Sequence, residues 1–351
     1  MRASKRGVAY YFTNTADTEA VSHVVSWWYN WALEPHSATA STDLEFIPML
    51  WGFDFSVDDA VQSILSRNPS AVLVLNEPNL VDQANTLPSV AAASWHKYEA
   101  VRNRTGVPIV GPQMNWGTLP GYEDPVTWLD AFYAEFNALH SRDPVIDALG
   151  LHWYDFGLNS TLETLTKYGK PFWVTELSNW HAEQYYTIDT PAEQIEQLDA
   201  MVGVLESRED VERYAWFTGR LVYDPHKVSL FNQSAGELSA VGEAYLAYPY
   251  AAPRPSHPPS PPPPSLPQPL SPPSAPADAG VSAAVVVLIV ALGAALVASP
   301  FVAMWALRPG SGRVFRIPDL KAHAPGVRVS GSRARFSPGP GEEWTFDSLV
   351  T

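Results

Sequence analysis

Short apolar runs recur along residues 1–252, and most are separated by segments with helical periodicity. The eight runs are Val8–Phe12, Trp27–Trp31, Phe46–Trp51, Ala71–Leu75, Pro108–Gln113, Ala148–Tyr154, Phe172–Thr175 and Tyr214–Phe217. Amphipathic segments predict helices, most clearly at Ser89–Arg104, Pro125–His140 and Pro191–Ser207, with a last helix at Ala235–Tyr245. This alternation of strand and helix predicts a parallel sheet with right-handed crossovers.

The number of repeats indicates a closed barrel. Eight strand–helix units in about 250 residues match the size of a (β/α)8 TIM barrel. The segment Leu33–Thr42 is short and irregular where the second helix should lie, so we expect an α/β barrel with reduced helices. An open doubly wound sheet is the alternative, but it needs a phosphate-binding glycine loop after an early strand. The sequence contains no such loop.

Composition changes after residue 252 and divides the chain into four parts. Residues 253–280 are rich in proline and serine, which predicts an extended, disordered linker. Residues 281–307 form a run of 27 positions without a charged side chain, and a bilayer-spanning helix needs about 20 apolar residues. We therefore predict a folded domain at 1–252, a linker at 253–280, a transmembrane helix at 281–307 and a disordered tail at 308–351.

The charge distribution predicts the orientation in the membrane. Residues 1–252 hold 14 Lys and Arg against 32 Asp and Glu, a net charge of −18, whereas residues 308–351 hold 7 against 4. Basic residues beside a membrane span stay in the cytoplasm, so we expect the tail inside and the acidic domain outside. An acidic domain also argues against a nucleic-acid partner. The first twenty residues lack the apolar stretch of a secretory signal, so we expect the natural chain to extend further at its N-terminus.

Polar residues follow the apolar runs at the points where the strands should end. In a parallel barrel these ends and the loops after them form the active-site face. The fourth run is followed by Asn76, Glu77, Pro78 and Asn79, and the seventh by Glu176. A carboxylate next to a buried strand is unusual, because burying an unpaired charge is costly. The fourth and seventh strands lie across the barrel mouth from each other, so we predict that Glu77 and Glu176 face each other over a cleft.

Two opposed carboxyl groups suit glycoside hydrolysis. One protonates the leaving oxygen, and in retaining enzymes the second, about 5–5.5 Å away, attacks the anomeric carbon. Asn76 is placed to bind the sugar 2-hydroxyl, while His152 and Tyr154 project from one side of the sixth strand toward the nucleophile. Aromatic side chains at strand ends offer flat faces to sugar rings. These aromatic residues are Tyr29, Trp51, Trp116, Trp153, Trp180 and Trp216.

Each of these residues also has a structural interpretation. Aromatic residues in strands are most often core, so we expect about half of them to line the cleft. His152 is equally well explained as a buried structural histidine. The nine histidines show no ligand-type spacing, so no metal site is predicted. The chain has neither cysteine nor a Gly-x-Ser-x-Gly elbow, which excludes a thiol nucleophile and argues against a serine hydrolase.

Six motifs in order resemble glycoside hydrolase family 128, a family of compact endo-β-1,3-glucanases. They read KRGVAYYF, FIPMLWG, LVLNEPN, VGPQMNWG, IDALGLHWYD and KPFWVTELSNW, and the resemblance covers about residues 5–248. It implies a small barrel with Glu77 as acid/base, Glu176 as nucleophile and Asn76 at the 2-hydroxyl. It further implies that substrate subsites are formed by Trp51, Asn115, Trp116, His152, Tyr154 and Trp216.

Together, the residues and the resemblance predict a monomeric, membrane-tethered and wall-facing retaining endo-β-1,3-glucanase that needs no cofactor. A non-catalytic β-glucan receptor is the alternative from another class, because a tether and a cytoplasmic tail suit a receptor. The two glutamates argue against it, since a pure binder has no need to bury opposed like charges. Hydrolysis of another linkage, as in β-1,4-mannan or mixed-linkage glucan, stays open because linkage choice depends on the shape of the cleft.

Overall fold

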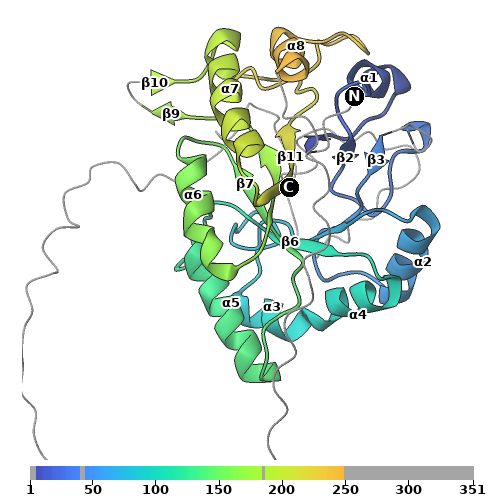
Figure 1. The fold of residues 1–351 in the computed structure, drawn as a ribbon, viewed down its shortest axis with the longest axis vertical. Coiled ribbons are helices and arrows are strands. Elements are labelled where there is room, and N and C mark those ends of the chain that lie inside the picture. Colours follow the sequence, from blue (N-terminus) through green and yellow to red (C-terminus); the bar gives the residue numbers. More distant parts are fainter. Residues whose placement is uncertain (1–4, 40–43, 184–185, 249–351) are drawn as a thin grey trace, which may run out of the picture. The chain divides into compact units, whose positions relative to one another are not determined.

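The computed structural model describes residues 5–39, 44–183 and 186–248 (Figure 1). The predicted linker at 253–280, the transmembrane helix at 281–307 and the tail at 308–351 therefore lie outside the described residues. Within the described ranges, no helix combines the length and the hydropathy needed to cross a membrane.

A curled parallel sheet lies at the centre of the fold, and it contains nine strands among the described residues. Their order is β3-β2-β1-β11-β8-β7-β6-β5-β4. The strands are β1 Arg6–Ala9, β2 Trp27–Tyr29, β3 Glu45–Phe46, β4 Met49–Leu50, β5 Val72–Val74, β6 Ile109–Met114, β7 Ala148–Trp153, β8 Phe172–Leu177 and β11 Val211–Phe217. All eight predicted runs thus contribute strands, and the third contributes two.

The third run closes the sheet into a barrel-like form. Its first half, β3, pairs with β2, and its second half, β4, pairs with β5. The intervening residues continue the contacts, because the Ile47 amide donates to Trp28 O (2.9 Å) and Pro48 O accepts from the Leu73 amide (2.9 Å). Pro48 itself has no amide proton for a ladder. One chain segment therefore joins both edges of the sheet, as expected for a barrel-like α/β fold.

Two hydrophobic clusters fill the two sides of the sheet. Successive strand residues alternate between them, so that Trp27 and Tyr29 belong to the smaller cluster and Trp28 to the larger. The smaller cluster contains inward-facing residues from around the barrel, and the larger contains residues of the strands and helices that pack outside it. Because both faces are buried, the strands read as continuous apolar runs rather than alternating ones.

Helices surround the strands (Figure 1). They are α1 Thr15–Val21, α2 Val57–Arg67, α3 Pro88–Ser94, α4 His96–Thr105, α5 Pro125–His140, α6 Leu158–Leu165, α7 Pro191–Ser207 and α8 Ala240–Ala247. Short 3-10 turns lie at Ser37–Thr39 and Thr166–Tyr168, and a small hairpin joins β9 Ala182–Glu183 to β10 Tyr186–Thr187.

The helix predictions hold with two differences in boundaries. The segment predicted at Ser89–Arg104 forms α3 and α4, which Trp95 separates. The last helix begins at Ala240 rather than at residue 235, because the Ser239 side chain accepts from the Gly242 amide and caps the helix there. In the described part of the region where the second helix was expected, residues 33–39, the structure contains only the 3-10 turn Ser37–Thr39, which agrees with the expected reduction.

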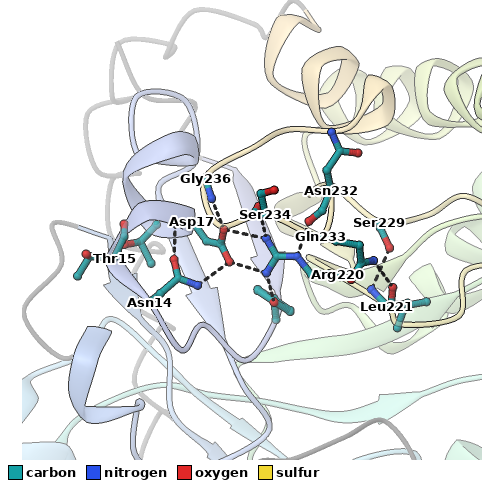
Figure 2. Close-up of polar contacts among 12 residues, drawn as sticks. Asn14, Thr15, Asp17, Arg220, Leu221, Ser229, Asn232, Gln233, Ser234 and Gly236 are labelled. Atoms are coloured by element: carbon teal, nitrogen blue, oxygen red, sulfur yellow. Dashed lines mark hydrogen bonds and ion pairs between the residues drawn. The ribbon is translucent and has the colours of Figure 1, made fainter.

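A buried ion pair fastens the segment between β11 and α8 to the start of the chain (Figure 2). Arg220 donates to both carboxylate oxygens of Asp17, at 2.9 and 3.0 Å. Asp17 is fully buried and also accepts from the Gly236 amide at 2.7 Å. Arg220 reaches Ser234 O at 3.0 Å. The pair therefore connects α1 to two points of the same segment.

Replacing Asp17 by Asn should lower the free energy of unfolding by roughly 3–5 kcal/mol, because the half-buried Arg220 loses its counter-charge. Burial alone would raise the pKa of Asp17, but the hydrogen bonds from Arg220, Gly236 and Asn14 bring it below its usual value. This stabilisation is thus complete at neutral pH and is lost as pH falls through the lowered pKa.

Urea unfolding of the unmodified protein and of Asp17→Asn, carried out between pH 3 and pH 7, measures the loss of stability and its dependence on pH. The exposed Arg104–Asp58 pair supplies the control, because Asp58→Asn should cost less than about 1 kcal/mol. Equal losses in the two variants would contradict the structural role of the buried pair.

Candidate active site

The segment after β5 turns sharply to place Glu77 at the barrel mouth. Leu75 and Glu77 have positive φ angles of 53° and 41°, a conformation that non-glycine residues adopt at a cost. Backbone hydrogen bonds hold the turn on both sides, from the Asn76 amide to Trp51 O (2.8 Å) and from the Glu77 amide to Gln113 O (2.9 Å). The neighbouring strands thus fix the direction of the carboxylate.

Two polar side chains from neighbouring strands contact one oxygen of Glu77. Asn115, which follows β6, donates its Nδ2 to Oε1 at 2.8 Å. The Nδ1 atom of His152, from β7, lies 2.8 Å from the same oxygen. Oε2 accepts no hydrogen bond from the part of the chain that the structure describes. This leaves Oε2 as the atom that can carry an exchangeable proton toward a ligand.

Glu176, near the end of β8, is held by aromatic donors. The Tyr29 hydroxyl and the Trp31 Nε1 donate to its Oε1 at 2.8 and 2.7 Å. The Tyr154 hydroxyl donates to Oε2. Glu176 is 4% exposed, so these donors replace the water that would otherwise solvate its charge. Surroundings that consist of hydrogen-bond donors favour an ionised carboxylate with a fixed orientation.

The two glutamates converge around His152. One oxygen of each carboxylate and a ring nitrogen of His152 lie within 4.8 Å of one another. The His152 Nε2 is 3.4 Å from Glu176 Oε1, but it has no aligned hydrogen-bond partner among the described residues. The two carboxylates, whose nearest oxygens lie within 4.8 Å of each other, are thus about as close as the carboxyl groups of retaining glycosidases, which are about 5–5.5 Å apart. The same three groups are also a ligand set that a divalent cation accepts, which the histidine spacing did not predict.

Burial and mutual charge control the titration of the site. Burial raises the pKa of Glu176, His152 opposes this rise, and the charge of Glu77 adds to it. Burial alone would lower the pKa of His152, but the two carboxylates outweigh it and raise that pKa above its ordinary value. Burial and then Glu176 raise the pKa of Tyr29 and Tyr154 well above the usual range, so both hydroxyls remain donors.

Comparison with known proteins agrees with this geometry. A family profile described as glycosyl hydrolase catalytic core matches residues 7–245. A GH128 subgroup II endo-β-1,3-glucanase from Pseudomonas viridiflava is 48% identical, with a TM-score of 0.69, over 72% of this chain and 100% of that one. The chain belongs to glycoside hydrolase family 128. It is therefore a glycoside hydrolase.

Two further GH128 structures are similar to this enzyme. An endo-β-1,3-glucanase of subgroup II from Sorangium cellulosum is 32% identical, with a TM-score of 0.61, over 71% of this chain and 100% of that one. A subgroup I endo-β-1,3-glucanase from Amycolatopsis mediterranei, solved with laminaritriose, is 30% identical, with a TM-score of 0.56. The match covers 70% of this chain and 99% of that one. No curated protein sequence matches the chain.

Most of the predicted site residues of this GH128 hydrolase lie at the barrel mouth. Asn76 is buried and donates to Gln83 at 3.2 Å, while its Oδ1 has no partner among the described residues. Trp180 packs its ring 6.0 Å from that of Tyr154. Trp51 and Trp116 follow β4 and β6 and are 39% and 53% exposed. Asn115 contacts Glu77 directly, a closer role than the subsite contact that was predicted.

The structure places Trp216 elsewhere. Its side chain is fully buried in the outer cluster, donates Nε1 to Val228 O at 2.8 Å and packs against Tyr245. This position corrects the expectation that Trp216 forms a substrate subsite. The neighbouring residues of β11 face the other way, and the inward Phe217 ring lies 5.6 Å from that of Tyr154. Trp153 is likewise buried and donates Nε1 to Phe156 O.

Trp31 is a site residue that the sequence did not reveal. Its position as the last residue of the predicted run Trp27–Trp31 was the only available signal, and aromatic residues at strand ends are common in this chain. Its side chain binds Glu176, a residue 145 positions away. Its ring also packs 5.9 Å from Phe217, so it joins the aromatic lining of the mouth to the carboxylate.

Replacing Tyr154 by Phe should move the acidic limb of the kcat/KM profile to higher pH. The Tyr154 hydrogen bond stabilises the ionised form of Glu176 and so lowers its pKa. Loss of that bond raises the pKa further, and the ionised fraction then falls earlier as pH decreases. The pH dependence of kcat/KM on a glucan substrate measures the shift. Tyr133→Phe, outside the site, supplies the control, and coincident acidic limbs for Tyr154→Phe and the unmodified enzyme would contradict this role.

Proposed function

We propose that this GH128 enzyme is a retaining endo-β-1,3-glucanase with Glu77 as acid/base and Glu176 as nucleophile. The observation that carries the proposal is the convergence of two buried glutamates, with oxygens within 4.8 Å of each other, at the ends of β5 and β8. The related endo-β-1,3-glucanases support the substrate, and one of them was solved with laminaritriose.

In the first step, the contacts of the glutamates give them different tasks. Glu77 is bound through Oε1, so Oε2 can hold the proton that passes to the glycosidic oxygen. Glu176 is held ionised by Tyr29, Trp31 and Tyr154 and attacks the anomeric carbon from the opposite side. The glycosidic bond breaks as an ester bond to Glu176 forms.

In the second step, water replaces Glu176 on the anomeric carbon. Ester formation removes the negative charge of Glu176, so the ionised form of Glu77 is no longer repelled and can accept a proton from water. The oxygen of that water bonds to the anomeric carbon as the ester bond breaks, which restores the β configuration. The unpaired Oδ1 of Asn76 is available to accept from the sugar 2-hydroxyl during both steps.

Single replacements should separate the two roles. Glu176→Gln should fold normally and lose at least about 10³-fold in kcat on laminarin, because no covalent intermediate can form.

Glu77→Ala should retain slow formation of the intermediate from an aryl laminarioligoside, whose leaving group needs little protonation. Added azide should then accelerate turnover and yield a β-glycosyl azide. Product analysis by NMR measures the configuration of the azide.

The contrary assignment has a distinct product. If Glu77 were the nucleophile, azide with Glu77→Ala would attack the substrate directly and give an α-glycosyl azide. Glu135→Gln is the matched control, because Glu135 is exposed on α5, outside the site. Turnover of laminarin by Glu176→Gln at the rate of this control would remove Glu176 from the mechanism.

We also propose that residues 281–307 anchor the enzyme in a membrane, with residues 1–252 outside and residues 308–351 in the cytoplasm. The uncharged run of 27 residues supports a membrane span. The basic residues Arg308, Arg313 and Arg316 follow it directly, and they support a cytoplasmic tail. The proline-rich residues 253–280 would then act as a spacer between membrane and barrel.

Protease added to intact cells that express the full chain should release active glucanase by cutting the spacer. Activity should remain with the membranes after alkaline carbonate extraction of untreated cells. Both results follow from a single span with the barrel outside. Deletion of residues 281–307 should give soluble activity and serves as the control. Protease-resistant activity that becomes sensitive only after lysis would reverse the proposed orientation.

A further inference from the structure

We infer that Gln113 is a positioning residue that sets the separation between the Glu77 and Glu176 carboxylates. The inference rests on the roles proposed above for these two glutamates. Gln113 lies in β6 and is fully buried. Its backbone binds the turn that carries Glu77, and its side chain binds Thr175, the residue before Glu176. One residue therefore contacts the supports of both carboxylates.

The backbone of Gln113 holds the turn after β5. Its amide donates to Leu75 O and its carbonyl accepts from the Glu77 amide, both at 2.9 Å. Asn76 lies between these contacts and forms a parallel bridge with Gln113. Because Leu75 and Glu77 both have positive φ angles, the turn needs outside support to keep its shape. The Gln113 backbone supplies that support from β6.

The side chain of Gln113 is oriented by its own strand. Its Nε2 donates to Val110 O at 2.7 Å, which directs Oε1 away from that carbonyl. Oε1 then accepts from the Thr175 hydroxyl at 2.6 Å. Thr175 is fully buried in β8, and an unpaired hydroxyl there would be costly. The hydrogen bond therefore fixes β8 relative to β6 one residue before Glu176.

A glycine in the intervening strand leaves room for this hydrogen bond. β7 lies between β6 and β8, and its Gly150 is paired with Gln113. A Cβ atom at Gly150 would lie 2.0 Å from Gln113 Oε1 and 2.4 Å from Gln113 Cδ. Gly150 is an ordinary strand residue without a positive φ angle, so its backbone conformation does not require glycine. The close approach of the Gln113 side chain does require it, and this contact makes the three strands one unit below the site.

The separation of the two carboxylates decides which reaction they can perform. Retaining enzymes hold the two carboxyl groups about 5–5.5 Å apart, whereas about 6.5–9.5 Å leaves room for a water molecule and leads to inversion. A displacement of about 1 Å can lower the rate about 10²-fold. Gln113 acts through its neighbours rather than on the sugar, so its loss should slow the chemical steps and change KM little.

The first test is Gln113→Leu, which keeps a side chain of similar size but removes the acceptor for Thr175. We expect kcat on laminaripentaose to fall about 10–100-fold while KM changes little. Tyr245→Phe is the matched control, because it removes a buried hydrogen bond to Gly7 O in the outer cluster, away from the site. Both variants should unfold at lower urea concentrations, but only Gln113→Leu should lose kcat. A kcat of Gln113→Leu equal to that of the control would overturn the inference.

The second test uses the contact between Gly150 and Gln113. Gly150→Ala should lower kcat about as much as Gln113→Leu, because the new Cβ displaces the Gln113 amide. In a Gln113→Ala background, Gly150→Ala should lower kcat little further, since the amide that it would displace is gone. Such non-additivity is expected for two changes that act on the same contact. Equal losses of kcat in the two backgrounds would mean that the residues act independently, which would contradict the inference.

Thr175 supplies a test that does not depend on the folding of Gln113→Leu. Thr175→Val should reproduce the loss of kcat, and Thr175→Ser should restore most of it by returning the hydroxyl. Equal kcat values for these two variants would overturn the inference alone, provided that the unmodified enzyme retains configuration. Hydrolysis without retention, or no hydrolysis, by the unmodified enzyme would overturn the proposed roles of Glu77 and Glu176 and this inference with them.

Discussion

Repulsion between two buried carboxylates is the constraint around which the barrel mouth is built. Glu77 and Glu176 have oxygens within 4.8 Å of each other and little contact with water. Such a pair is tolerated only when donors compensate its charge or one member takes up a proton. The compensation is divided by type: an amide and an imidazole contact Glu77, whereas hydroxyl and indole groups contact Glu176. That difference in surroundings supports the separate chemical roles that we propose for two identical side chains.

The Asn-Glu-Pro-Asn segment organises more than its glutamate. Asn76 presents an unpaired oxygen near the site, Glu77 contacts Asn115 and His152, and Asn79 fastens the loop after β6. Because that loop carries Asn115, the same segment positions both Glu77, the proposed acid/base, and one of its partners. A substitution at Asn79 would therefore alter the position of Asn115, and through it Glu77, without removing a contact to the substrate. Of the two amides near the glutamate, Asn79 thus has a structural role and Asn76 a proposed role in binding the sugar.

The apolar runs and the polar residues after them were sufficient to predict the barrel-like fold and the positions of Glu77 and Glu176. They were not sufficient to predict that the Trp216 side chain faces outward, because every residue from Tyr214 to Phe217 is apolar or aromatic. Without polar positions, the sequence shows no contrast between the inward and outward faces of β11. Trp31 was missed because its partner is distant in sequence. The start of α8 depended on a local cap at Ser239 rather than on periodicity.

The stereochemistry of the first product is the most direct test of the proposed roles of Glu77 and Glu176. Proton NMR can follow the anomeric signals while the enzyme hydrolyses laminaripentaose, before mutarotation mixes the two forms. The proposed double displacement predicts that β-anomers are released first and that α-anomers grow in later, because two displacements restore the original configuration. Release of α-anomers first would mean a single displacement by water, and Glu176 could then not be the nucleophile.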